Sequence, residues 1–228
     1  KQWPAYKTTT PLVVIPCSAD LELFDPQNID ENLKENFRVK LGINKNEFIV
    51  SYLGSIGGWY LTAEMMMFCK RVLLKIPQAR FLFISPHLHQ QIIDTAAKYD
   101  VPRDKIISTK ALRKEVPALL SFSSYSLFFI KPCYSKLSSS PTKHGELMAL
   151  GIPVITNAGV GDVKDIVDKY KGGYVVDDFS ESSFDKVIEQ MENAIFDNKS
   201  IREGAFEFYK IKKAIDSYTA LYDEILKD

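Results

Sequence analysis

Residues 48–76 have the sequence FIVSYLGSIGGWYLTAEMMMFCKRVLLKI and contain one complete strand–loop–helix unit. The run Phe48–Leu53 is too continuously apolar to leave one face in water, which is typical of a parallel strand covered on both sides. A glycine-rich loop follows, and then Leu61–Ile76, a stretch of helical length. This unit predicts an α/β fold.

The same alternation extends along the chain. Further strands are predicted at Leu12–Ile15, Ala79–Ile84, Lys105–Ser108, Ser126–Ile130, Pro153–Thr156 and Tyr174–Val176. Further helices are predicted at His87–Tyr99, Val116–Ser121, Lys143–Leu150 and Phe184–Phe196. Strands that alternate with helices indicate a Rossmann-like, doubly wound parallel sheet with helices on both faces.

The two ends of the chain lack a βα unit of their own. Residues 1–26 are predicted to be an extended linker, with Asp and Pro near its end, and residues 201–228 to form one or two amphipathic helices. The chain has 228 residues, more than a typical domain but fewer than two. We therefore expect residues 27–200 to form a single domain.

Composition excludes several classes of protein. Lys plus Arg and Asp plus Glu both total 29, so no net charge attracts the chain to nucleic acid or to an acidic membrane. The three cysteines, Cys17, Cys69 and Cys133, lack metal-ligand spacing and suit reduced thiols in a cytosolic protein, so we expect neither disulfides nor zinc. No apolar run approaches a membrane span, and the first residue is not Met, so we expect a soluble fragment of a longer protein.

The glycine loop Gly54–Tyr60 is the first candidate binding site. Glycines let the backbone approach a ligand closely, and the start of the following helix offers free N–H groups and a positive dipole end. The loop matches neither the dinucleotide-binding G-x-G-x-x-G pattern nor a Walker A loop, which argues against NAD, FAD or ATP. An ordinary βα turn is the alternative. Trp59 and Tyr60 are either a ligand wall or packing at the loop base.

The second candidate loop is Ser139–Lys143, with Ser140 suited to the N-cap and Pro141 to the first position of a helix. Lys143 would then be the third helical residue, where a cation opposes the helix dipole by roughly 0.3–1 kcal/mol. Helix stability alone does not favour a lysine there, whereas a bound anion would. Glu146 follows three residues later and can project from the same edge.

These residue types suit a nucleoside diphosphate. The hydroxyls, N–H groups and ammonium of the second loop could bind a pyrophosphate, while Glu146 could accept hydrogen bonds from two vicinal ribose hydroxyls. A solvated Lys–Glu pair of little energetic value is the alternative. Both loops follow strands, so they emerge at the edge of a parallel sheet where such folds bind ligands.

The segment SSPTKHGELMALGIPVIT, residues 139–156, resembles the donor-site segment of the group 1 (family 4) glycosyltransferases of the GT-B fold. The likeness extends to Val14–Phe24, the Gly54 loop and Glu115–Leu120. It implies that the chain is the C-terminal, donor-binding half of such an enzyme. Residues 1–26 would join the absent N-terminal domain, and residues 201–228 would pack on that domain, so that in its absence they would expose an apolar face.

The resemblance also assigns roles to residues. Glu146 would bind the ribose, and Ser140, Thr142 and Lys143 would hold the diphosphate together with Gly54 and Ser55. The backbone of Lys110, Ala111 and Leu112 would contact the base. Lys143 and Glu146 are the candidate catalytic residues.

This chain departs from the family pattern at two places. Ser138 lies where many relatives have a second Glu that contacts the donor sugar, so the sugar is not predicted. Ser55, Trp59 and Tyr60 replace an Arg and a Lys that many relatives carry in and after the first loop. Lys143 is then expected to carry more of the phosphate charge.

The expected function is transfer of a hexosyl group from a nucleoside diphosphate sugar to a glycan, lipid or small-molecule acceptor, in glycan biosynthesis. The resemblance implies retention of anomeric configuration and no metal, with Lys143 and the helix dipole stabilising the leaving diphosphate. The fragment alone should be inactive, and the protein cytoplasmic, with peripheral membrane association of the full-length form as an alternative. A nucleotide-sugar epimerase of related fold and a non-catalytic nucleotide-sugar-binding module are the rival functions.

The three histidines are not assigned a metal-binding or catalytic role. His87 and His89 are two residues apart and do not share a helical face, so a metal role is not favoured. His144 adjoins the phosphate loop and is either a ligand contact or a boundary residue. No nucleophilic triad can be assembled from these positions.

Overall fold

The computed structural model describes residues 12–86 and 89–226. Within them the chain forms one parallel sheet, whose strands are β1 (Ile49–Leu53), β2 (Arg80–Ile84), β3 (Ile106–Thr109), β4 (Tyr125–Leu127), β5 (Val154–Asn157) and β6 (Gly173–Val176). The longer helices are α1 (Glu31–Leu41), α2 (Thr62–Lys75), α3 (His89–Lys98), α4 (Val116–Leu120), α5 (Thr142–Ala149), α6 (Val163–Tyr170), α7 (Glu181–Met191), α8 (Asn198–Phe208) and α9 (Ile211–Ile225).

The sheet order is β3-β2-β1-β4-β5-β6, with every neighbouring pair parallel. Val50 of β1 pairs with Phe81 on one side and with Tyr125 on the other. The chain therefore leaves β1 in one direction and returns to its other side at β4. Such a reversal of strand order opens a crevice at the carboxyl ends of the two strands, where open α/β sheets bind ligands. The predicted Rossmann-like fold is confirmed.

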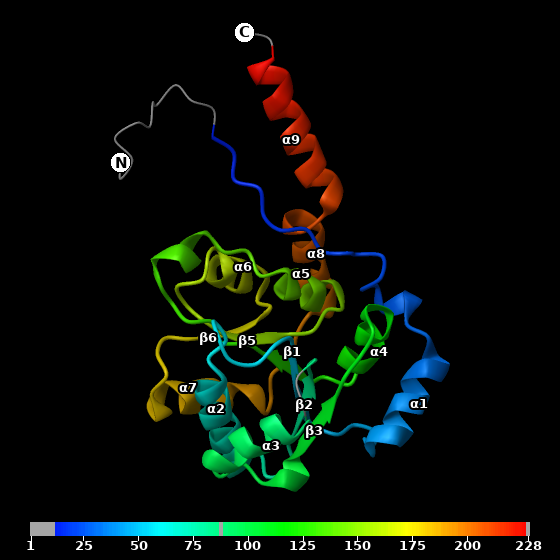
Figure 1. Cartoon of the computed structure of the whole chain (residues 1–228), viewed down its shortest axis with the longest axis vertical. Helices are drawn as coiled ribbons and strands as arrows, with labels where there is room; N and C mark the ends of the chain where they lie inside the picture. The colour runs from blue at the N-terminus through cyan, green and yellow to red at the C-terminus, as the bar shows by residue number, and fades with distance from the viewer. Residues whose placement is uncertain (1–11, 87–88, 227–228) are drawn as a thin grey trace.

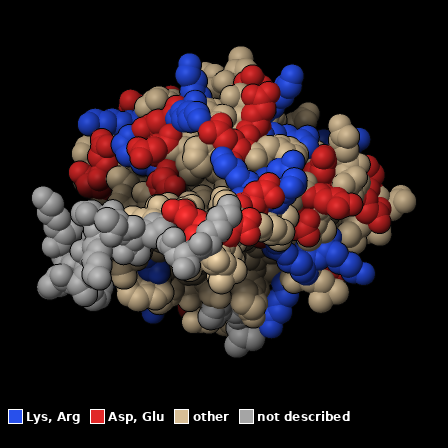
Figure 2. All heavy atoms as spheres, turned by 90° about the horizontal axis from the view of Figure 1, so that it is seen from above, with Lys and Arg blue, Asp and Glu red and all other residues tan. Residues whose placement is uncertain are grey.

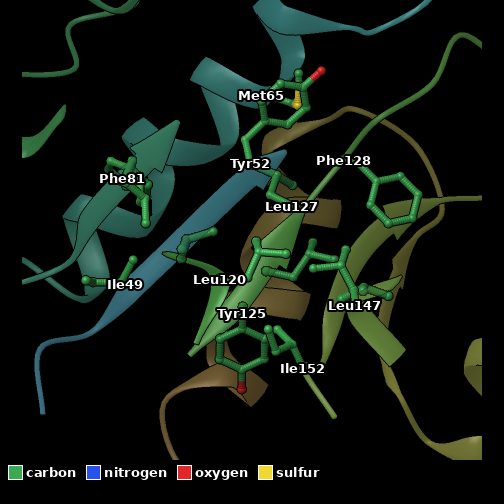
Figure 3. Close-up of a cluster of buried hydrophobic side chains, with 14 of the residues drawn as sticks. Ile49, Tyr52, Met65, Phe81, Leu120, Tyr125, Leu127, Phe128, Leu147 and Ile152 are labelled. Carbon is green, nitrogen blue, oxygen red and sulfur yellow. The ribbon is translucent and has the colours of Figure 1, made fainter. Parts of the chain in front are cut away.

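Helices cover both faces of the sheet (Figure 1). α2, α3 and α7 lie on one face, and α5 and α6 lie on the other, with α8 packed against α5. Because both faces are covered, the central strands β1 and β4 are almost entirely buried, including Ser51 and Ser126, as the run Phe48–Leu53 indicated. Figure 3 shows part of the resulting core, in which Leu127 of β4 and Leu147 of α5 belong to one cluster of buried side chains.

Most predicted elements are present with boundaries shifted by a few residues, but one strand prediction is wrong. Leu12–Ile15 forms no strand, and Leu12 and Val14 are 75% and 81% exposed. The segment is apolar, but hydrogen-bonded pairing with a neighbour is what makes a strand. Its nearest sheet-like contact comes later, where Ala19 bridges Lys210 and its N–H donates to the carbonyl of Tyr209.

Two helices were not predicted, α1 and α6. α1 carries Leu33, Phe37 and Leu41 four residues apart, and its N-cap Asp30 and left-handed C-cap Gly42 define its ends, so its sequence did contain a helical signal. α6 is eight residues long and buries Val163, Ile166 and Val167, and two helical turns give only a weak periodic signal.

The C-terminal region divides into two helices of different kind. α8 is buried at Ile201, Gly204 and Ala205, whereas none of the fifteen residues of α9, all of which the structure describes, is buried. α9 extends beyond the body of the domain (Figure 1). The expected exposed apolar face is therefore present on α9 but not on α8.

The surface carries both signs of charge. The face shown in Figure 2 has Lys and Arg side chains interspersed with Asp and Glu, in keeping with the equal totals of basic and acidic residues. Among residues 12–86 and 89–226, no helix is long and apolar enough to cross a membrane.

Candidate functional site

The carboxyl ends of β1, β2 and β3 surround a cavity of about 510 Å³. Its wall contains Gly54 from the glycine loop, Ser85 and Pro86 after β2, and Lys110–Leu112 with Glu115 after β3. The N–H of Gly54 donates to the carbonyl of Ile84, which holds the start of the glycine loop against the end of β2. The cavity thus lies on the predicted ligand-binding edge, beside the reversal between β1 and β4.

Lys143 projects from the start of α5 toward the glycine loop. Its Nζ is 3.8 Å from the ring centroid of Tyr60 and 4.9 Å from that of Tyr52, so two aromatic rings face the ammonium. A Cβ on Gly54 would lie only 2.8 Å from this Nζ, and Gly54 has a φ of +130°. The backbone conformation at this position favours glycine, and the missing side chain leaves room for the end of Lys143.

The ammonium of Lys143 is buried, and it makes no hydrogen bond with any residue the structure describes. Burial lowers the pKa of Lys143 from its ordinary value of 10.5 to about 7, while the negative charge of Glu146 opposes that shift. The aromatic rings offset part of the cost of burial but donate no counter-charge. Among the described residues no carboxylate is hydrogen-bonded to this ammonium.

Glu146 is buried on the next turn of α5, with a side chain only 5% exposed. Its Oε1 forms an ion pair with the Nη2 of Arg113 at a distance of 2.7 Å. The guanidinium of Arg113 also lies 4.6 Å from the ring centroid of Phe24, in the segment before α1. The structure thus brings Lys143 and Glu146 together as predicted and adds Arg113.

The start of α5 differs from the sequence-based prediction. The helix begins at Thr142 with Pro141 as its N-cap residue, so Lys143 is the second helical residue rather than the third. Ser140 does not cap the helix. Its Oγ accepts a hydrogen bond from the N–H of Cys17 at 3.1 Å, because the segment before α1 passes close to this loop.

The other predicted hydroxyl ligands lie at the surface. Ser55, Thr142 and Ser138 are exposed, and the Oγ of Ser138 donates to the carbonyl of Ser135. The carbonyl of Ser55 accepts a hydrogen bond from the hydroxyl of Tyr52, which shapes the glycine loop. Their contacts with a diphosphate stay predictions.

The predicted base-binding stretch, Lys110–Leu112, lines the cavity. The N–H of Leu112 is already engaged, since it donates to Oε2 of Glu115 at 2.7 Å, and the carbonyl of Lys110 accepts from the hydroxyl of Thr109. These bonds fix the turn that carries the stretch. Base recognition there stays a prediction.

His144 is a core residue. It is fully buried, its Nδ1 is hydrogen-bonded to the hydroxyl of Tyr209 at 3.0 Å, and burial lowers its pKa to about 3. Of the two alternatives left open for His144, the structure supports a structural position between α5 and the α8–α9 junction. His87 lies outside the described residues, and the exposed His89 is hydrogen-bonded to Ser108.

Trp59 and Tyr60 have separate environments. Tyr60 is half-buried against Lys143, whereas Trp59 is 53% exposed and faces the ammonium of Lys136 at 4.6 Å. In the described part of the chain, no three His, Cys, Asp or Glu side chains lie close enough together to hold a metal ion. The three cysteines are free thiols.

Sequence reasoning missed three side chains of this region: Arg113, Tyr52 and Tyr209. Tyr52 belongs to a strand that was predicted, and its place one residue before the carboxyl end of β1 was the signal that could have located it near the crevice. Arg113 and Tyr209 gave no signal, because their partners lie 33 and 65 residues away in the sequence.

Comparison with known proteins identifies the family. Residues 34–207 match the family model described as Glycosyl transferases group 1. These residues cover more than half of the chain and include the Gly54 loop, the cavity wall and α5. No significantly similar sequence was found among curated proteins.

Solved structures show the same fold. The chain is similar to sucrose-phosphate synthase from Thermosynechococcus elongatus, with a TM-score of 0.66 and 20% identity over 93% of this chain and 52% of that one. It is also similar to HepE from Anabaena, solved in complex with UDP and glucose, with a TM-score of 0.69 and 12% identity over 90% of this chain and 55% of that one.

A third similar structure is the C-terminal domain of a group 1 family glycosyl transferase, LpcC, from Francisella tularensis. Its TM-score is 0.55 at 16% identity, and the match covers 87% of this chain and 96% of that domain. The chain thus spans about half the length of the first two proteins but nearly all of the separate domain. With its GT-B type of Rossmann-like fold, the chain belongs to the group 1 glycosyl transferase family.

Proposed function

We propose that this chain binds the nucleoside diphosphate of a sugar nucleotide, and that the whole protein transfers the sugar to an acceptor. The buried, unpaired ammonium of Lys143 carries the proposal. A buried cation without a counter-ion is costly, and that cost is offset when an anion binds beside it. The complex of HepE with UDP and glucose supports a sugar nucleotide as that anion.

The arrangement of the site supports an assignment of the ligand's parts. The diphosphate would lie between Lys143 and the glycine loop at Gly54, close to the N-terminus of α5. The ribose would lie at Glu146, one turn along the same helix, and the base in the cavity lined by Lys110–Leu112. Ser140, Thr142 and Ser55 are the proposed hydroxyl contacts.

This placement gives Lys143 a chemical role. As the bond between sugar and diphosphate breaks, negative charge develops on the leaving diphosphate, and a preorganised cation stabilises that charge. The partial positive charge at the N-terminus of α5 acts in the same direction. Retention of configuration and the hexosyl nature of the donor stay predictions from the family resemblance, as does the cytoplasmic location.

The acceptor side lies outside this chain in the proposal. Its similar proteins of full length are about twice as long, and transfer requires donor and acceptor in one site. We therefore expect the 228-residue chain to bind a nucleoside diphosphate but not to transfer the sugar of a nucleoside diphosphate sugar.

The test is Lys143→Gln, assayed by titration with UDP, GDP and ADP. Loss of a charge-assisted contact should weaken binding of the preferred nucleotide by at least roughly 1.5 kcal/mol, about tenfold, while the empty variant is as stable as the wild type or more so. Lys164→Gln is the matched control, since it removes one charge from an exposed Lys–Asp pair on α6. Unchanged affinity in Lys143→Gln would exclude Lys143 from the site.

The pKa of Lys143 adds a second measurement. Between pH 7 and 10.5 the unfolded chain holds a proton that the folded chain lacks, so wild-type stability should rise with pH in that window. Binding of the diphosphate needs the charged form, so affinity should fall above pH 7 by up to about tenfold per pH unit. Both dependences should be absent from Lys143→Gln. If that variant retains them, another group is responsible.

A further inference from the structure

Arg113 connects three segments that are distant in sequence. It belongs to the turn after β3, pairs with the buried carboxylate of Glu146 on α5, and lies over the fully buried ring of Phe24. The Arg113 side chain is 55% exposed, whereas that of Glu146 is 5% exposed. An exposed cation therefore reaches into the domain to meet a buried anion.

The turn that carries Arg113 is held from within. The N–H of Leu112 donates to the side chain of Glu115, and the N–H of Glu115 donates to the carbonyl of Leu112. Leu112 and Glu115 line the cavity after β3, while Arg113 lines a neighbouring cavity of about 700 Å³ with Asp20 and Asp25. Within this turn, Leu112 and Glu115 therefore line the cavity, while Arg113 extends to Glu146.

Phe24 restricts where the guanidinium can lie. A guanidinium is attracted to the face of an aromatic ring. Because the group is planar and its five N–H donors have fixed directions, contact with the ring also limits where those donors can point. The segment that carries Phe24 is itself anchored, because Asp25 pairs with Arg202 of α8 at 2.9 Å. Phe24 thus supports the guanidinium of Arg113, which in turn pairs with the carboxylate of Glu146.

The ion pair leaves Glu146 able to accept more hydrogen bonds. A carboxylate has about four lone-pair sites on two oxygens, and Arg113 approaches Oε1. The remaining sites suit a pair of hydroxyl donors. A buried carboxylate that lost its cation would keep its desolvation cost without compensation, and its orientation would no longer be fixed.

We propose that Arg113 is a positioning residue: it holds the carboxylate of Glu146 in the orientation that accepts hydrogen bonds from the 2′- and 3′-hydroxyls of a ribonucleotide. The site would then select nucleotides that carry both hydroxyls. This inference depends on the proposed function, since it assumes that the ribose lies at Glu146. It adds a residue outside α5 that acts through Glu146 and not on the ligand.

The experiment compares each nucleotide with its own analogue. UDP, GDP and ADP are titrated together with their 2′,3′-dideoxy counterparts into the wild type, Arg113→Gln, Arg113→Lys and Glu146→Gln. The ratio of ribo to dideoxy affinity measures recognition of the hydroxyls alone. Partial unfolding of a variant lowers both affinities equally and cancels in the ratio. Lys114→Gln is the matched control, because it removes a neighbouring exposed charge from the same turn.

The wild-type ratio should be large, since a site built to bind hydroxyls discriminates strongly against analogues that lack them. Arg113→Gln should reduce that ratio by about tenfold with little change in dideoxynucleotide affinity. Arg113→Lys should recover part of the loss, because it restores the charge without the planar fork. Adding Arg113→Gln to Glu146→Gln should change the ratio no further, since the two residues act as a unit.

The results that would contradict the role of Arg113 differ from the result that would contradict the proposed function. A large wild-type ratio that Arg113→Gln leaves unchanged, or a loss that is equal for ribo- and dideoxynucleotides, would overturn the role of Arg113 and leave the proposed function intact. Failure of the wild type to bind any of the three nucleotides would overturn the proposed function, and the inference on Arg113 with it.

Discussion

Helix α5 packs against α8 and helix α9 follows α8 in the sequence, but α5 and α9 differ completely in burial. Six of the eight residues of α5 are buried, whereas α9 buries none of its fifteen. α9 nevertheless carries a regular apolar stripe, at Ile211, Ile215, Tyr218, Tyr222 and Ile225, all of them more than half exposed. An apolar helical pattern therefore shows that a helix has a face to bury, but not that this chain buries it.

The contrast arises from what each helix packs against. α5 lies between the sheet and α8, and two glycines permit the close approach. A Cβ on Gly145 would lie 2.5 Å from the ring of Tyr209, and one on Gly204 would lie 2.4 Å from Met148. The same tight packing buries polar groups of α5, including the carboxylate of Glu146 and the imidazole of His144. In α5 the functional candidate Glu146 is thus itself a buried residue, whereas α9 has no buried residue and no candidate site residue.

Leu147→Ala should have the largest effect on stability. The side chain is 1% exposed and belongs to the buried cluster shown in Figure 3, so its truncation leaves a cavity between α5 and the sheet. Such changes cost about 2–5 kcal/mol of unfolding free energy, which chemical denaturation would measure. A loss below about 1 kcal/mol would show that α5 is more loosely packed than the structure indicates.

The buried His144 should produce an intermediate effect that depends on pH. Its folded pKa of about 3 lies below its ordinary 6.5, so between these values the unfolded chain holds a proton that the folded chain lacks. Stability should therefore be lost as the pH falls from 6.5, by roughly 2 kcal/mol at pH 5. Lys143 titrates in part of the same interval, so the contribution of His144 is the difference between the wild type and a His144 variant in the stability lost from pH 8 to pH 5, as denaturation measures it.

The matched variants separate His144 from the other histidines. His144→Phe should show a smaller loss between pH 8 and pH 5 than the wild type, because the titrating group is gone. His89→Gln, at an exposed position, should retain the wild-type loss. If His144→Phe and the wild type lose the same stability, the acid sensitivity comes from elsewhere.

Ile215→Ala should have the smallest effect, although it removes as much apolar side chain as the change at Leu147. Ile215 is 54% exposed on α9 and fills no space in the core. We expect its unfolding free energy to lie within about 0.5 kcal/mol of the wild type and its nucleotide affinity to be unchanged. A loss comparable to that of Leu147→Ala would mean that α9 packs on the domain in solution, and the contrast between the helices would fail.

Much of the fold could be predicted from the sequence, because the apolar runs of the strands are local signals. The strand at Phe48–Leu53 and the helix after it were found within a few residues of their observed ends. Leu12–Ile15 has the same apolar composition and forms no strand, because no strand in the described part of the chain pairs with it. α1 is a different case: Leu33, Phe37 and Leu41 lie four residues apart between the cap residues Asp30 and Gly42, so its sequence carried a helical signal that the prediction omitted.

For the candidate site, the sequence by itself determined which chemistry is present: a glycine loop, Lys143 and Glu146 at helical spacing, and the family to which they belong. Only the tertiary structure decided the state of those groups. The ammonium of Lys143 is buried without a partner, and Glu146 is paired with Arg113, which lies 33 residues earlier. The physical reason is that residue type and spacing are local, whereas desolvation and ion pairing depend on which distant segments the fold places around each charge.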